Sequence, residues 1–261
     1  CALMDPAMAN PPEKTSSSPR STLDDEARQL PKRFYKTAAP ASRGKGYAIE
    51  LDGRPMKTPK RTPLEVPSEA LAVAIAVEWN ALSDVIDPGK LPLTKIANTA
   101  IDGVVGREAE IHDDLVRYIG NDLLFYRAEA PESLVARQAA AWDPVLAWFA
   151  DTYGAVFKTT IGIMPIEQSP LMVAKAASAL SNETAMSLAP LHVMTTLTGS
   201  ALLTIAHRQD RLTPDQIWHA THVDEDWQIE QWGADAEADA RRAVRRAELQ
   251  SAADFLALLR L

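Results

Sequence analysis

The chain has 261 residues, of which 46% are apolar and 24% are charged. This length and composition are enough for one large core or two modest ones. The formal net charge of −8 argues against general nucleic-acid binding, which needs clustered Lys and Arg. The one cysteine is Cys1, so the chain cannot form an internal disulfide, and a thiolate nucleophile or a cysteine-based zinc site is disfavoured.

The first 30 residues are rich in Pro, Ser and charged side chains. They carry too few large apolar groups to pack, so we predict a disordered tail, with residues 1–7 added ahead of a native start at Met8. The segment lacks the pattern of a secretory signal, and the most apolar long window, 185–206, is interrupted by Pro190 and His192. We therefore expect a cytoplasmic protein without a membrane insertion.

A small antiparallel meander is predicted between residues 33 and 66. Asp52-Gly53 is flanked by GYAIEL and RPMKTP, and this dipeptide favours a two-residue hairpin turn, in which both positions have positive φ. RFYKTA before the hairpin and TPLEV after it would complete about four strands. Because prolines at 55, 59 and 63 cannot donate ladder hydrogen bonds, we expect these strands to be short or to lie at an edge.

The stretch ALAVAIAVEW, residues 70–79, fits a strand by alternation and a helix by composition. It follows Pro67-Ser68-Glu69, which resembles a helix start, and alanine favours helices over strands. We predict a helix with its large residues on one face: Leu71, Ile75, Trp79 and Leu82. Glu78 beside Trp79 is an acid within this apolar stripe, and a buried helix spine is a better interpretation than a binding face.

The rest of the chain reads as mainly helical, with β-like segments at 122–127 and 155–162. The composition shift near residues 128–131 marks the predicted domain boundary. We therefore predict an α+β fold with a tail at 1–30, an N-terminal α+β domain at 31–128 and a C-terminal helical bundle at 129–261. The predicted helices are 94–104, 107–119, 131–153, 170–180, 184–206, 213–231 and 235–259.

The glycine clusters do not match phosphate-binding loops. Thr198-Gly199-Ser200 and Arg43-Gly44-Lys45-Gly46 lack the several glycines between a strand and a helix that such a loop needs. No catalytic serine, zinc-protease or calcium-loop motif is present in the sequence. We expect no cofactor and no small-molecule substrate.

One cluster has metal-ligand spacing. On a continuous helix His219, His222 and Asp226 would share a face, and two imidazoles one turn apart can bind one metal ion. Glu230 lies on the same face, however, and a wholly polar face is typical of a solvated helix surface. A small metal-dependent hydrolase built on this cluster is the alternative function.

An acid within an apolar stripe points to binding. On a continuous helix Trp218, Ile229 and Trp232 would form this stripe, with Glu225 in its middle. Asp224 would lie next to the stripe, one position further round the helix. An unpaired buried carboxylate would cost several kcal/mol, so either an arginine of this chain pairs with Glu225 or the stripe is an exposed groove that awaits a partner. Aromatic grooves with a charged anchor are typical of interaction hot spots.

An ordered series of segments resembles a known family. The segments are KRFYK, GYAIELDGRPMKTPKRTPLEVPSEALAVAIAVEW, LPLTKIANTAID, DLLFYR, AAWDPVLAWFADTYG and DEDWQIEQWG, which run from about residue 33 to 233. Together they resemble the ATP synthase F1 complex assembly factor 2 family, and the last predicted helix continues the match. None of these segments is catalytic.

The resemblance implies that the C-terminal helical bundle is orthogonal. It also implies a non-enzymatic chaperone that holds the free F1-ATPase α subunit until a β subunit takes its place. It places the family's functional acid at Asp224 or Glu225, and the family's tryptophan after the Pro-Ser-Glu start at Trp79. Mitochondrial relatives carry an import peptide, which this sequence lacks, so we expect a bacterial cytoplasmic member. The expected partner-binding residues are Asp224, Glu225, Trp232, Trp218 and Trp79. A permanent structural subunit of a complex is a third hypothesis, distinguished by its presence in the finished assembly.

Overall fold

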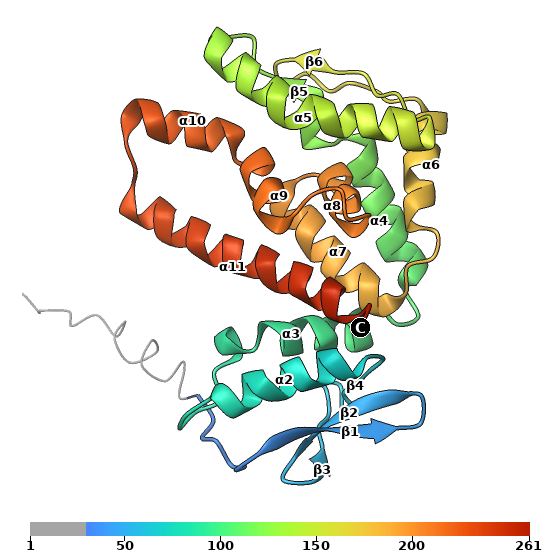
Figure 1. Cartoon of the computed structure of the whole chain (residues 1–261), viewed down its shortest axis with the longest axis vertical. Coiled ribbons are helices and arrows are strands. Elements are labelled where there is room, and N and C mark those ends of the chain that lie inside the picture. Colours follow the sequence, from blue (N-terminus) through green and yellow to red (C-terminus); the bar gives the residue numbers. More distant parts are fainter. Residues whose placement is uncertain (1–29) are drawn as a thin grey trace, which may run out of the picture.

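The structure is a computed structural model that describes residues 30–261, so the predicted tail lies almost wholly outside the described residues. A small antiparallel sheet with α2 (Glu69–Ala81) and α3 (Pro92–Thr99) forms one end of the molecule, and the remaining helices form the other (Figure 1). This arrangement confirms the predicted α+β fold. The other helices are α4 (Glu108–Gly120), α5 (Glu132–Tyr153), α6 (Pro170–Ala177), α7 (Ala185–Thr198), α8 (Ala201–Arg208), α9 (Pro214–Thr221), α10 (Val223–Trp232) and α11 (Ala236–Leu258).

The four-stranded sheet is centred on β2 (Gly46–Leu51), which pairs antiparallel with β1 (Ala38–Arg43), β3 (Arg54–Pro55) and β4 (Glu65–Val66). Asp52 and Gly53 have φ of 48° and 77°, which confirms the predicted hairpin turn. The first strand was predicted over RFYKTA but begins at Ala38. Backbone N–H groups of residues 36 and 37 instead donate to the Asp52 carboxylate, and Arg43-Gly44-Lys45-Gly46 makes the first hairpin turn.

Helix α2 packs one face on the sheet, as the apolar spacing predicts. The Ser68 hydroxyl accepts a hydrogen bond from the Leu71 N–H at 3.0 Å and so caps the helix start. The predicted spine is buried: Leu71, Ile75, Trp79 and Leu82. Val73 and Val77 on the opposite face are 43% and 61% exposed.

Glu78 joins α2 to the start of α3. Its carboxylate accepts hydrogen bonds from the Leu93 N–H at 2.6 Å and the Thr94 N–H at 3.0 Å. The Thr94 hydroxyl donates to the same carboxylate. It also accepts a hydrogen bond from the Trp79 indole N–H at 3.0 Å. Burial raises the pKa of Glu78, and these hydrogen bonds oppose that rise. The internal partners support the helix-spine interpretation of Glu78.

Two predicted helices are each divided in the structure. The predicted helix 184–206 ends at Gly199, whose φ is 67°, and restarts at Ser200, whose hydroxyl caps α8 by accepting the Leu203 N–H at 3.0 Å. The predicted helix 213–231 breaks at His222, which ends α9 and precedes α10. The left-handed Gly199 and the Ser200 cap divide the first helix, and at the second break the His222 side chain bonds back to the Trp218 carbonyl at 2.8 Å.

The β-like segments contribute less strand than predicted. Only β5 (Tyr126–Arg127) and β6 (Thr160–Ile161) form, and they pair with each other in parallel. Helix α4 packs against α6, α7 and α8, on the helical side of the molecule (Figure 1). The boundary at residue 128 therefore stays a proposal. Within the described part of the chain, no helix is long and apolar enough to cross a membrane.

Asp122 is a fully buried carboxyl group that the sequence analysis did not identify. It accepts the Leu202 N–H at 3.0 Å and the Leu124 N–H at 3.2 Å, and so ties the turn before β5 to the first turn of α8. Burial raises its pKa to about 7, against hydrogen bonds from the α8 start that lower it. The Asp122 carboxyl group thus provides hydrogen-bond acceptors for two backbone N–H groups that would otherwise be buried without a partner.

We predict that Trp79→Arg lowers the free energy of unfolding by about 3–5 kcal/mol, because it replaces a buried ring with an unpaired charge. Val77→Arg is the control, since Val77 lies on the exposed face of the same helix. Chemical denaturation measures both variants. Equal stability of the two variants would show that Trp79 is not a core residue.

Asp122 should make stability depend on pH. Its folded pKa of about 7 lies above the unfolded value of 3.8, so between these values the folded state binds more protons. Its contribution to the free energy of unfolding is therefore full near pH 4 and is lost as the pH rises to about 7. We expect the stability difference between the wild type and Asp122→Asn to change in that direction across this window. A constant difference in urea titrations at several pH values would contradict this.

Candidate partner-binding site

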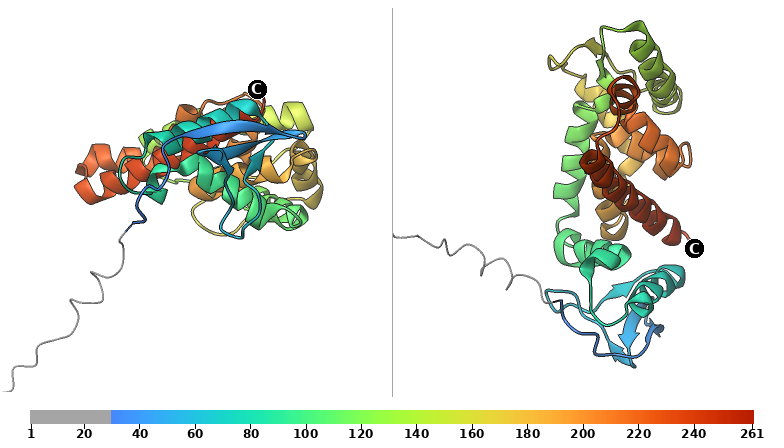
Figure 2. Two further views of the ribbon diagram at one scale, coloured as in Figure 1. Left: turned by 90° about the horizontal axis from the view of Figure 1, so that it is seen from below. Right: turned by 90° about the vertical axis from the view of Figure 1, so that its left-hand side faces the viewer.

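Helices α10 and α11 form a hairpin that projects from one edge of the helical part (Figure 2). The two helices are joined by residues 233–235, and Gly233 at the end of α10 has a φ of 90°. Val223 is the only residue of α10 that is buried, although the helix also carries Ile229 and two tryptophans. Helix α10 is therefore held by polar contacts rather than by a large apolar face.

One set of polar contacts joins α10 to α5. The buried Gln138 side chain donates to the Asp224 carboxylate at 2.7 Å and accepts the Ala128 N–H at 2.8 Å. Arg137 next to it makes a two-pronged ion pair with Glu230, at 2.8 and 2.6 Å. This ion pair lowers the pKa of Glu230. Asp224, one of the two predicted anchors, is thus already engaged within the chain.

Arg242 of α11 makes the second set of contacts. Its guanidinium lies 3.4 Å from the Glu225 carboxylate and also pairs with Asp226. The Arg242 side chain is 18% exposed, whereas the Glu225 side chain is 50% exposed. Both alternatives for Glu225 are therefore present together: an arginine of this chain pairs with it, and half of it still faces solvent.

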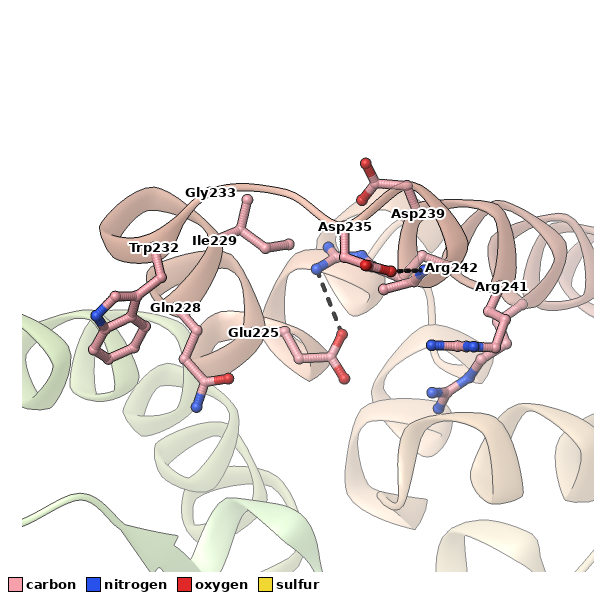
Figure 3. Close-up of a pocket in the computed structure, with 11 residues that line it drawn as sticks. Glu225, Gln228, Ile229, Trp232, Gly233, Asp235, Asp239, Arg241 and Arg242 are labelled. Carbon is pink, nitrogen blue, oxygen red and sulfur yellow. Dashed lines mark hydrogen bonds and ion pairs between the residues drawn. The ribbon is translucent and has the colours of Figure 1, made fainter.

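A cleft of about 440 Å³ separates α10 from α11 (Figure 3). Ile229 and Trp232 line it from α10, and Trp232 is 75% exposed. Glu225 and Arg242 meet in the same cleft, as the dashed line in Figure 3 shows. An acid therefore lies beside apolar groups in a cleft between two helices, whereas the predicted stripe ran along one helix and included Trp218.

The predicted apolar stripe is divided because the helix breaks at His222. Trp218 lies in α9, is 6% exposed and stacks on the His222 ring with 3.7 Å between ring centroids. Trp79 is 8% exposed and lies in the N-terminal core, as part of the α2 spine. The structure brings together Glu225 and Trp232, with Asp224 beside them on α10, and places Trp218 and Trp79 in the interior. Their roles in partner binding stay predictions.

The metal-ligand cluster does not assemble. The His222 Nδ1 donates to the Trp218 carbonyl at 2.8 Å, and burial lowers the pKa of His222, so the ring is a neutral core group. His219 is exposed, and its Nδ1 lies 4.0 Å from the Asp226 carboxylate that Arg242 already pairs. Among residues 30–261, no group of three His, Cys, Asp or Glu side chains could hold a metal ion.

Sequence reasoning missed the residues that position the site. Gln138 and Arg137 lie about 90 positions before their partners on α10, and no spacing rule connects them. Arg242 belongs to the run of arginines at 241–246, but only the fold shows which arginine faces α10. A half-exposed carboxylate beside an exposed aromatic ring can recognise a basic and apolar protein surface.

Comparisons with known proteins agree with this architecture. The family model described as ATP12 chaperone protein matches residues 32–150. The mitochondrial protein atp12 of Schizosaccharomyces pombe is 25% identical over 215 residues, which cover 78% of this chain and 74% of that protein.

Two solved bacterial structures are more similar in sequence. Atp12 from Paracoccus denitrificans is 38% identical, with a TM-score of 0.83 over 88% of this chain and 98% of its own. The Atu1473 protein of Agrobacterium tumefaciens is 42% identical, with a TM-score of 0.86 over 93% of this chain and 92% of its own.

The contacts of α10 give a test of what holds the site. We expect Gln138→Leu to lower the free energy of unfolding by about 1–3 kcal/mol, because the Ala128 N–H and the Asp224 carboxylate lose a buried partner. Arg137→Leu is the neighbouring control, and loss of its exposed ion pair should cost less than about 1 kcal/mol. The reverse order of the two effects in denaturant titrations would contradict this account.

Proposed function

The chain belongs to the ATP12 chaperone family, and we propose that it is an assembly chaperone of ATP synthase. In this proposal the protein binds the free F1 α subunit and prevents its aggregation until a β subunit takes its place. It acts by reversible binding, without a chemical step. The family membership supports the chaperone role, and the open cleft between α10 and α11 is the observation that carries the binding role.

The cleft suits a client that carries apolar and basic groups together. An unassembled subunit exposes the apolar surface of its missing interface, and such a surface is prone to aggregation. Ile229 and Trp232 offer apolar area at the cleft, and Trp232 stays 75% exposed although the Trp227 ring packs edge-on against it, with 5.4 Å between ring centroids. Glu225 keeps half of its side chain in solvent beside them. A client can therefore bury an apolar group against Ile229 and Trp232 and form an ion pair with Glu225 in the same cleft.

Between the two predicted anchors, we assign the client contact to Glu225 and a supporting role to Asp224. Asp224 is bound to Gln138 at 2.7 Å, and that bond holds α10 on α5. Glu225 faces the cleft, where the Arg242 guanidinium lies 3.4 Å and the His222 Nε2 lies 3.8 Å from its carboxylate. A basic side chain of the client would pair with the Glu225 carboxylate together with Arg242 or in its place.

The bacterial origin of both solved relatives supports a bacterial protein that works in the cytoplasm.

We predict that Glu225→Lys keeps the fold and abolishes protection of the α subunit. Loss of one member of a desolvated charge pair typically costs about 2–5 kcal/mol of binding, and reversal adds repulsion from the arginines of α11. Light scattering by isolated F1 α subunit under aggregating conditions measures the effect. A melting curve on the same sample separates loss of binding from loss of fold.

Glu237→Lys is the matched control, because Glu237 is an 83% exposed acid of α11 outside the cleft lining. It should protect the α subunit as well as the wild type does. A folded Glu225→Lys variant with unchanged protection would end the claim for this acid. Wild-type protein that leaves the scattering unchanged at a several-fold excess would end the proposed function.

A further inference from the structure

A group of exposed apolar side chains lies outside the lining of the cleft. Of thirteen large apolar residues that are exposed in the described part of the chain, five lie between residues 156 and 171. The most exposed is Ile163, at 92%. We call these five residues the apolar loop surface: Val156, Ile161, Ile163, Met164 and Leu171.

The loop that carries this surface is held in place. The buried Gln168 side chain accepts the Lys158 N–H at 3.0 Å and donates to the Lys158 carbonyl at 2.8 Å, as a neighbouring strand would. The Gly162 N–H donates to the Arg127 carbonyl of β5 at 2.8 Å. A loop that exposes its apolar side chains while its backbone is fixed at both ends presents a preformed surface.

Strand β6 gives this surface a direction. Since the Gly162 N–H points to β5, alternation along the strand turns the N–H and carbonyl of Ile161 toward the opposite edge of β6. That edge faces outward at the end of the helical part (Figure 1). An outward strand edge beside apolar side chains binds an extended apolar segment, through main-chain hydrogen bonds and side-chain burial.

The two surfaces are connected through β5 and α5. Strand β6, next to the apolar loop surface, pairs with β5, and Ala128 directly after β5 donates to the Gln138 side chain of α5 at 2.8 Å. The same Gln138 side chain donates to Asp224 of α10 at 2.7 Å. The cleft and the apolar loop surface therefore belong to one connected frame, and a single client can contact both.

We infer that the apolar loop surface and the outward edge of β6 form a second docking site, which takes an extended apolar segment of the unassembled F1 α subunit. This inference rests on the proposed function. The cleft supplies a charged anchor, and the second site supplies apolar burial. Engagement of one client at two linked sites raises the overall affinity well above that of either site.

The test uses full-length protein and isolated F1 α subunit. In Ile163→Asp/Met164→Asp the apolar loop surface is disrupted, and the concentration that half-protects the α subunit should rise roughly 100-fold. Val105→Asp is the control, because Val105 is a 58% exposed loop valine in the N-terminal half. Hydrogen exchange of residues 158–164 should slow when the α subunit is added to the wild type.

Ile161→Pro tests the strand edge separately, since it removes an outward N–H and keeps an apolar side chain. It should also weaken protection. If the wild type protects the α subunit and the Ile163/Met164 variant protects it at the same concentration, the second site is overturned and the proposed function stands. Absence of wild-type protection would overturn both. Sedimentation that shows the wild type as a dimer and the variant as a monomer would assign the surface to a second copy and overturn the inference.

Discussion

The ion pair between Arg242 and Asp226 is the contact on which the shape of the site depends. Helix α10 buries one residue, Val223, so apolar packing alone cannot hold it beside α11. Arg242 closes the base of the hairpin, and Gln138 and Arg137 hold α10 from the α5 side. Because polar contacts do this work, Ile229 and Trp232 remain at the cleft, where a partner can bury them. The same polar contacts that hold α10 in place leave its apolar side chains accessible to a partner.

The rest of the molecule supplies a fixed frame for that hairpin. Helix α11 packs along α7 and α3 and so connects the site to the N-terminal part. Glu78 ties α2 to α3, and Asp122 ties the turn before β5 to α8. These two carboxyl groups, of which Glu78 is half-buried and Asp122 fully buried, accept hydrogen bonds from backbone N–H groups at helix starts. The same residue type thus has a structural role in the core and a proposed recognition role at the surface.

Local signals in the sequence predicted the parts of the fold that local physics decides. Pro67-Ser68-Glu69 marked the start of α2, and Asp52-Gly53 marked the hairpin turn. The breaks at Gly199 and His222 were missed because the predicted helices were extended through them. At the first break the left-handed φ of Gly199 and the Ser200 cap divide the helix. Asp224, Glu225 and Trp232 were predicted as site residues from the helical pattern and the family resemblance. The contacts of Gln138 and Arg242 with α10 were not predicted, because their partners are distant in sequence. The division of the Trp218–Trp232 stripe follows from the missed break.

The central claim is that the cleft between α10 and α11 receives the free α subunit. The most direct measurement places a photo-crosslinking amino acid at Trp232, which is 75% exposed in the cleft, and irradiates it with isolated α subunit and with assembled F1 in parallel. The account predicts a crosslinked product with the free α subunit and none with assembled F1, whose interfaces are already filled. Absence of a product with free α, or equal products with both, would contradict it.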